Sequence, residues 1–235
     1  MELHRFMPRR QRISSVLLTI IFMLCPPPSF AGPASVQDPR PRIVAFGDSL
    51  TAGLGVSTDE SYPAQLQKRL DGLRYRYRVI NAGVSGDTTA GGLRRVTWIL
   101  NGKPYVVILE LGGNDGLRGL SLDQTRNNLD QIIQRLQQAG TIVVLAGMKL
   151  PPNYGKDYTA GFEALYAALA KKYRLPLIPF FLEGVAASTT LNQADGIHPA
   201  KDGYTVIVEQ ILKTLRPVLD QQAGKPLGHQ GGDKH

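Results

Sequence analysis

Five apolar segments recur along the chain, and four of them are rich in valine and isoleucine with little alternation between apolar and polar positions. This pattern is typical of parallel strands that are covered on both faces of a sheet. The last segment is short and flanked by proline, which favours an edge strand. The segments are RIVAF (42–46), RVINA (78–82), YVVILEL (105–111), TIVVLAG (141–147) and PLIPF (176–180).

Amphipathic helical patterns lie between these segments and after the last one. Apolar residues at spacings of three and four place one face of each helix against a core. Ser61 can cap one such helix with Pro63 in its first turn, and Gly140 can end another. The apolar positions are Leu129, Ile132, Ile133 and Leu136; Phe162, Leu165, Tyr166, Leu169 and Tyr173; and Tyr204, Ile207, Val208, Ile211 and Leu215.

Strands that alternate with helices predict a parallel sheet with helices on both faces. Right-handed crossovers favour a doubly wound, flavodoxin-like order of strands. The predicted fold class is therefore α/β, a three-layer α/β/α sandwich around a five-stranded parallel sheet. Ligands bind such sheets beyond the carboxyl ends of the strands, so we expect the chemistry in the loops that follow strands.

The N-terminus has the pattern of a secretory signal peptide. A basic stretch, 1–12, precedes an apolar run, 13–25, and Ser29 and Ala31 supply small residues for a cleavage site. The run is shorter than the roughly 20 apolar residues of a membrane-spanning helix. We predict cleavage after Ala31 and a periplasmic or secreted protein. An uncleaved anchor and a lipid attached to Cys25 are the alternatives.

The remainder is predicted to form one domain without internal repeats. The expected boundaries are a signal peptide at 1–31, a lead-in at 32–41, the folded domain at 42–219 and a disordered tail at 220–235. The tail has too few apolar residues to build a core. The chain has 235 residues and one cysteine, which would leave with the signal peptide. Its stability must then come from its core and not from disulfides.

The formal net charge of +8 raises the question of an anionic partner. The basic residues are scattered, apart from LRYRYR (73–78), which directly precedes a predicted strand. We interpret this stretch as a solvated edge and expect no nucleic-acid partner. Weak association with an anionic membrane surface is compatible with the charge. We expect a monomer.

Four polar loops carry the candidate catalytic residues. Serine needs a nearby base to become a nucleophile, and histidine suits this role because its ordinary pKa lies near neutrality. His198 is the one histidine outside the predicted signal peptide and tail. Asp195, three residues earlier, can orient its ring and stabilise the imidazolium. The loops are FGDSLTAG with Ser49, NAGVSGDTT with Gly83, LGGND with Asn114, and DGIHP with Asp195 and His198.

Acyl transfer also needs donors for an oxygen that becomes negative. The Ser49 amide, the Gly83 amide and the Asn114 carboxamide are candidates for this oxyanion hole. Simpler roles exist for the same residues: a turn glycine, an asparagine that bonds local backbone, and a histidine that caps a helix. The sequence contains no G-x-S-x-G elbow, no glycine-rich phosphate loop after the first strand and no histidine- or cysteine-rich cluster. We therefore expect no cofactor and no metal.

Taken in order, the four loops resemble the motif blocks of the SGNH (GDSL) hydrolases, and the resemblance spans residues 42–215. It implies that Ser49 is the nucleophile, His198 the general base and then acid, and Asp195 the orienting carboxylate. It also implies that Gly83 and Asn114 join the Ser49 amide in the oxyanion hole and that Asp48 braces the serine loop. Two further segments, ELGGNDGLRGL (110–120) and MKLPPNYGKDY (148–158), are similar to segments bordering the acyl site in the bacterial periplasmic thioesterase, lysophospholipase and arylesterase type.

The resemblance implies a cofactor-free serine hydrolase that cleaves carboxylic esters or thioesters through an acyl-enzyme on Ser49. Leu117, Leu120, Leu150 and Pro151 lie in loops near the expected site and favour an apolar acyl group, although ordinary packing explains them equally well. The expected substrate is a small acyl ester, a thioester or a lysophospholipid. A carbohydrate acetylesterase and a non-catalytic lipid- or glycan-binding module are the alternatives.

Overall fold

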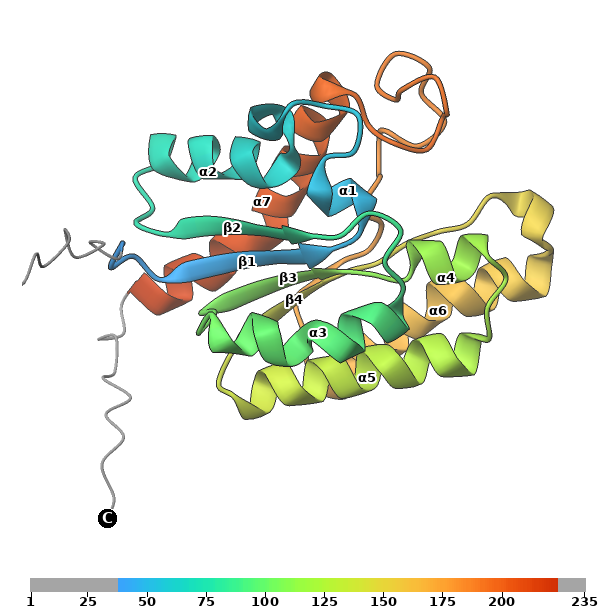
Figure 1. Ribbon diagram of the computed structural model, residues 1–235, viewed down its shortest axis with the longest axis horizontal. Helices are drawn as coiled ribbons and strands as arrows, with labels where there is room; N and C mark the ends of the chain where they lie inside the picture. Colours follow the sequence, from blue (N-terminus) through green and yellow to red (C-terminus); the bar gives the residue numbers. More distant parts are fainter. Residues whose placement is uncertain (1–37, 224–235) are drawn as a thin grey trace, which may run out of the picture. The chain divides into compact units, whose positions relative to one another are not determined.

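A single parallel sheet organises residues 38–223, which are the residues that the computed structural model describes. The order of its five strands is β2-β1-β3-β4-β5, so the chain starts near one edge and crosses over between β2 and β3 (Figure 1). The predicted α/β class and the flavodoxin-like order are both confirmed. The strands are β1 (Arg42–Gly47), β2 (Arg78–Gly83), β3 (Val106–Glu110), β4 (Ile142–Ala146) and β5 (Leu177–Ile178).

Helices cover both faces of the sheet. Figure 1 shows α2 and α7 on one face and α3, α5 and α6 on the other, which gives the three predicted layers. The α-helices of the described residues are α1 (Ser49–Ala52), α2 (Tyr62–Gly72), α3 (Thr89–Asn101), α4 (Gly113–Leu117), α5 (Leu122–Gln138), α6 (Lys156–Tyr173) and α7 (Lys201–Ala223). Two short 3₁₀ turns, η1 (Thr58–Glu60) and η2 (Pro152–Tyr154), lie in connecting loops.

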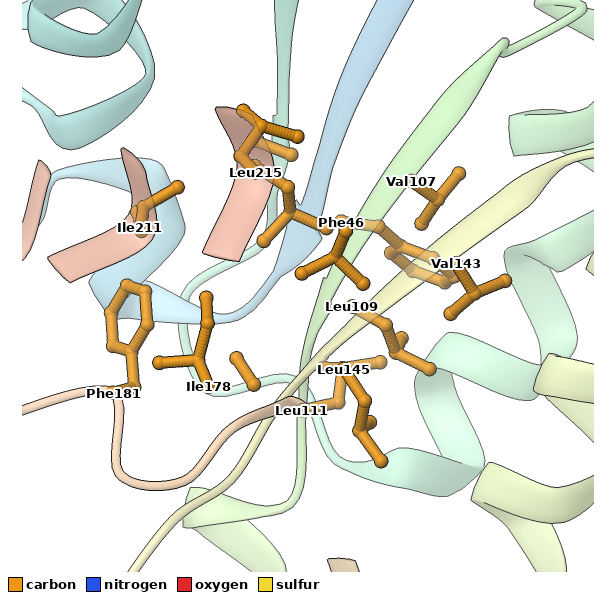
Figure 2. Packing of buried hydrophobic residues seen from close by; sticks show 14 of the residues in the cluster. Phe46, Val107, Leu109, Leu111, Val143, Leu145, Ile178, Phe181, Ile211 and Leu215 are labelled. Carbon is orange, nitrogen blue, oxygen red and sulfur yellow. The ribbon is translucent and has the colours of Figure 1, made fainter. Parts of the chain in front are cut away.

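The core lies on both sides of the central strands. Every residue of β3 is buried, as are all residues of β1 after its first. Figure 2 shows side chains from β1, β3 and β4 packed together with Ile211 and Leu215 of α7. Each large apolar side chain that is fully buried stabilises the fold by about 1.5–3 kcal/mol relative to exposure. This rigid centre fixes the points at which the strands end and the catalytic loops begin.

The C-terminal helix is longer than the predicted domain. α7 continues through Ala223, so the residues from Asp220 to Ala223 are helical although the tail was expected to begin at 220. The apolar face of the helix extends to Leu219, which is fully buried, and the hydroxyl of Tyr75 donates to Asp220 Oδ1 at 2.5 Å. The remainder of the predicted tail and the whole predicted signal peptide lie outside the described residues.

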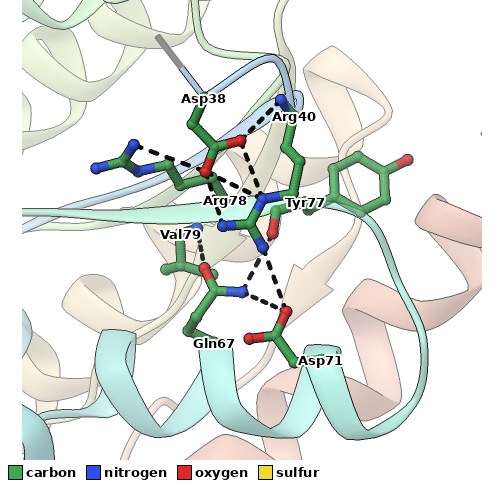
Figure 3. A network of polar contacts seen from close by, with 7 residues as sticks. All are labelled: Asp38, Arg40, Gln67, Asp71, Tyr77, Arg78 and Val79. Carbon is green, nitrogen blue, oxygen red and sulfur yellow. Dashed lines mark hydrogen bonds and ion pairs between the residues drawn. The ribbon is translucent and has the colours of Figure 1, made fainter. Parts of the chain in front are cut away.

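A polar network attaches the end of the lead-in to the edge strand β2 (Figure 3). Arg40 Nη2 lies 2.7 Å from Asp38 Oδ2, and this contact lowers the pKa of Asp38 to about 2. Gln67 of α2 accepts from the amide of Val79 at 2.7 Å and donates to the carbonyl of Tyr77 at 3.1 Å. Its side chain therefore satisfies backbone groups on an edge that would otherwise be open to another strand.

None of the helices within residues 38–223 is long and apolar enough to span a bilayer.

Candidate active site

A chain of three hydrogen-bonded side chains forms at the carboxyl edge of the sheet. His198 Nε2 lies 2.9 Å from Ser49 Oγ, and His198 Nδ1 lies 2.7 Å from Asp195 Oδ2. The fold thus brings together three residues that the sequence places at opposite ends of the domain. Both distances are those of direct hydrogen bonds.

Ser49 is held in a tight turn where β1 ends. It is the first residue of α1, and the Asp48 carboxylate caps this helix by accepting from the Leu50 amide at 3.0 Å. The Ser49 side chain is mostly buried, with 8% of the residue exposed. Its amide makes no hydrogen bond with any other described residue, as is usual for the first amides of a helix. The turn therefore leaves one backbone donor available beside the hydroxyl.

Asp195 and His198 occupy a turn that precedes α7. Asp195 Oδ1 accepts from the amides of His198 and Ile197 at 3.0 and 2.9 Å. These backbone bonds, together with the His198 ring, lower the pKa of Asp195 to about 2. The carboxylate is thus negative at neutral pH and can stabilise a positive imidazolium.

A second contact joins the histidine loop to the serine loop. Gln193 Nε2 donates to the carbonyl of Leu54 at 2.7 Å and to that of Pro199 at 3.1 Å. One side chain therefore bridges the loop after α1 and the loop that carries His198. This bridge fixes the spacing between the hydroxyl and the imidazole.

The Asn114 carboxamide lies close to the nucleophile turn. Asn114 Nδ2 donates to Asp48 Oδ2 and to the backbone carbonyl of Asp87, both at 2.9 Å. Asn114 also lines the cavity that contains Ser49 and His198. The predicted bracing role of Asp48 is consistent with these contacts, since the same carboxylate binds the Leu50 amide and the Asn114 side chain.

The structure argues against Gly83 as an oxyanion donor. β2 ends at Gly83, its amide donates to Asn81 Oδ1 at 2.9 Å, and it does not line the cavity. A Cβ at this position would clash with the backbone nitrogen of Ala52, so the glycine is required for the close approach of β2 to α1. The physical reason for its presence is packing.

Gly86, three residues later in the same sequence motif, differs from Gly83 in its backbone conformation and in its amide, although neither glycine lines the cavity. Its φ of +78° is in the left-handed region, and its amide makes no hydrogen bond with another described residue. The next residue, Asp87, binds Asn114 through its carbonyl. The sequence analysis assigned the backbone donor to Gly83, because this glycine directly follows the predicted strand. The feature that would have indicated Gly86 is that the second glycine of NAGVSGDTT directly precedes an aspartate.

A cavity of about 590 Å³ is lined by Ser49 and His198. Its walls are mainly apolar, and Leu117, Leu150 and Pro151 line it as expected, whereas Leu120 does not. The sequence analysis did not predict that the segment after β5 forms part of the cavity wall, because loop residues show no periodic pattern. The apolar lining residues after β5 are Phe180, Leu182, Ala186, Ala187 and Ile197, whereas Met148 lies in the segment 148–158 that was expected to border the site.

Two carboxyl groups are buried beneath the nucleophile turn. Burial raises the pKa of Asp48 to about 6, although the bonds from Leu50 and Asn114 oppose this shift. Burial and the neighbouring Asp48 raise the pKa of Glu110 well above its ordinary value. Sequence reasoning gave Glu110 no role, since it stood at the end of an otherwise apolar segment.

Within residues 38–223, no group of three or more histidine, cysteine or carboxylate side chains is placed to hold a metal ion.

A serine that can pass its proton to a histidine held by a carboxylate, at the carboxyl edge of a doubly wound sheet, defines a serine hydrolase. The chain belongs to the GDSL-like lipase/acylhydrolase family, whose model matches residues 45–206.

Similar proteins carry names from the same class of enzymes. Esterase TesA of Pseudomonas aeruginosa is 46% identical over 178 residues, which cover 75% of this chain and 89% of that protein. Thioesterase 1/protease 1/lysophospholipase L1 of Escherichia coli K12 is 40% identical over 182 residues, or 77% of this chain and 86% of that protein. The crystal structure of TesA superposes with a TM-score of 0.73 at 46% identity and covers 75% of this chain and 99% of that one.

Proposed function

We propose that the protein hydrolyses carboxylic esters and thioesters of apolar acyl groups through an acyl-enzyme on Ser49. The observation that carries this proposal is the 2.9 Å contact between Ser49 Oγ and His198 Nε2 at the mouth of an apolar cavity. The names esterase, thioesterase, lysophospholipase and arylesterase among the relatives support the same reaction class.

In the acylation step, His198 Nε2 takes the proton from Ser49 Oγ while Oγ forms a bond to the carbonyl carbon. The carbonyl oxygen becomes negative, and the Asp195 carboxylate stabilises the imidazolium. His198 then gives its proton to the leaving alcohol or thiol as the C–O or C–S bond breaks. The acyl group remains on Ser49.

In the deacylation step, water takes the place of the leaving group. His198 accepts a proton from this water while the water oxygen attacks the acyl carbon. Collapse of the second tetrahedral intermediate releases the acid, and His198 returns the proton to Ser49 Oγ. Protons and electrons balance without any further reactant.

The proposed oxyanion hole consists of the Ser49 amide, the Gly86 amide and Asn114 Nδ2. The first two donors are free of other hydrogen bonds among the described residues. Asn114 carries two N–H groups, and both are engaged with Asp48 and Asp87. Donation to the oxyanion therefore requires Asn114 to share or exchange one of these bonds when the substrate binds.

The cavity favours acyl chains over acetylated sugars as substrates, because an apolar wall gains free energy by covering hydrocarbon and offers few partners for hydroxyl groups. We expect export to the periplasm or beyond from the pattern of residues 1–31, and a monomer that associates at most weakly with membranes. Sequencing the mature N-terminus tests the export proposal: a start at Gly32 supports cleavage, and an intact N-terminus contradicts it.

The reaction is tested with p-nitrophenyl esters from acetate to palmitate and with a fluorophosphonate probe. The wild type is expected to hydrolyse the esters and to be labelled at Ser49, whereas the S49A variant does neither and keeps its fold. Ester hydrolysis by S49A at the wild-type rate would refute the role of Ser49. A protein that binds lipid but neither reacts with the probe nor turns over would be a binding module.

A further inference from the structure

Glu110 places a carboxyl group in the core directly behind the nucleophile. It is the last residue of β3, it is fully buried, and its register partner on β1 is Gly47. A Cβ on Gly47 would clash with the Glu110 carboxyl and with the Thr51 hydroxyl. The glycine before Asp48 and Ser49 is therefore required by the space that the glutamate occupies.

The contacts of Glu110 lie on both sides of Ser49 in the sequence. Oε2 accepts from the hydroxyl of Thr51 at 2.7 Å and from the amide of Asp48 at 3.3 Å. The turn that presents the nucleophile is thus fastened to β3 at the residue before Ser49 and at the second residue after it. Glu110 does not line the cavity, so it has no route to contact a substrate.

Hydrogen bonds satisfy the Glu110 carboxyl group only in part. Among the described residues, no lysine, arginine or histidine bonds to it, and Oε1 has no hydrogen-bond partner. An ionised carboxylate in this place would be strongly disfavoured, and burial together with Asp48 accordingly raises the pKa of Glu110. The groups that interact electrostatically with it are Asp48, Tyr62 of α2, Tyr166 of α6 and Tyr204 of α7.

We propose that Glu110 is a positioning residue for hydrolysis: its carboxyl group anchors the Asp48–Thr51 turn to β3 and thereby sets the place where Ser49 Oγ meets His198. This inference rests on the proposed function of Ser49. It assigns Glu110 an effect on the chemical step and none on the binding of substrate. Misplacing a reacting atom by about 1 Å costs on the order of 10²-fold in rate.

The test compares four variants for kcat and KM on p-nitrophenyl esters, for the rate of Ser49 labelling by a fluorophosphonate, and for melting temperature. E110Q keeps the shape and an acceptor oxygen without a charge, whereas E110L removes both contacts. T51V removes only the hydroxyl that binds Glu110. T141V is the matched control, because Thr141 is also buried but donates to the carbonyl of Pro104, before β3, at 3.1 Å.

We expect E110L to lose about 10²-fold in kcat and in labelling rate with KM within about threefold of wild type. E110Q should stay within about threefold of wild type and keep the same pH profile, since its amide oxygen can accept the same two hydrogen bonds. T51V should lose about tenfold in kcat, and T141V should lose none. If E110L lowers only the melting temperature and leaves kcat per labelled site unchanged, Glu110 serves packing and does not position Ser49.

Folded E110L with wild-type kcat and labelling overturns the proposal. E110Q that is as impaired as E110L overturns the claim that an acceptor oxygen at this position anchors the turn. Should E110L fail to fold, T51V decides: a rate equal to that of T141V refutes the anchoring role. Wild-type protein that is not labelled at Ser49 would instead refute the proposed function, so the two failures are distinguishable.

Discussion

Arg95 of α3 and Asp87 form an ion pair in which Nε lies 2.7 Å from Oδ2. The other two guanidinium nitrogens donate to the carbonyls of Ala82 and Gly47, at 2.7 and 2.8 Å. One side chain therefore ties together the ends of β1 and β2 and the loop that carries Gly86.

Replacing Arg95 by methionine should impair both stability and catalysis. The substitution leaves Asp87, of which only 10% of the side chain is exposed, without its cation. We expect a loss on the order of 3 kcal/mol in the free energy of unfolding by urea, and a lower kcat because the loop ends are released. Arg126 pairs with Asp123 on the exposed surface of α5, so R126M is the control and should change stability by no more than about 0.5 kcal/mol. Equal effects of R95M and R126M would contradict the role of Arg95 in holding the loop ends together.

The two glycines of the second motif should respond to alanine in different ways. G83A introduces a Cβ against the backbone of α1 and should mainly destabilise the fold. G86A meets an unfavourable φ of +78° and should displace the proposed donor amide, lowering kcat by about tenfold or more. G119A is the control, since Gly119 has a φ of +63° and open space around its Cα, but its amide donates to the carbonyl of Gly116 at 3.0 Å. A normal kcat for G86A would exclude its amide from the oxyanion hole.

Replacing the Asp195 carboxylate should strongly lower the rate of hydrolysis and leave the fold intact. D195N removes the negative charge that stabilises the imidazolium and should lower kcat by about 10⁴-fold. The pKa of about 2 implies that Asp195 remains ionised throughout the mildly acidic range. Loss of activity in that range should then have a cause other than protonation of Asp195. D202N, at the nearby start of α7, should hydrolyse esters like the wild type; a similar loss in D202N would contradict the assignment.

Stability should depend on pH through Asp48. Its pKa is raised from 3.8 to about 6 in the folded state, so the folded protein binds more protons than the unfolded chain between these values. The contribution of Asp48 to the free energy of unfolding should therefore fall as pH rises from about 3.8 to about 6, by on the order of 3 kcal/mol. Glu110, whose pKa is also raised, contributes a further fall of the same sign. D48N should make this slope smaller in urea denaturation at a series of pH values, because only the contribution of Asp48 is lost. An unchanged slope would assign the titration to another group.

The sequence predicts the sheet well because strands that are buried on both faces consist almost entirely of apolar residues. β1, β3 and β4 coincide with continuous apolar runs, and the long helices α5, α6 and α7 coincide with clear apolar spacings. α3 was not predicted, because Gly91 and Gly92 interrupt its start and weaken its pattern. α1 and α4 have four and five residues, which is too short for a period to show.

The site is only partly visible in the sequence. Ser49, Asn114, Asp195 and His198 belong to ordered motifs, and their side chains meet as the parallel strands require. Gly83 and Gly86 cannot be distinguished without knowing where β2 ends. Glu110 looks like a polar interruption of an apolar strand until its register partner, Gly47, is known. These roles depend on how neighbouring strands pack, and this packing cannot be predicted from a short stretch of sequence.

The hydrogen bond between Ser49 and His198 spans 149 positions of the chain. A nascent chain that contains Ser49 but not yet His198 lacks the catalytic base and is therefore inactive. Reactivity towards esters is thereby postponed until both residues have been made and folded together, and fragments that end before His198 should not cleave ester bonds.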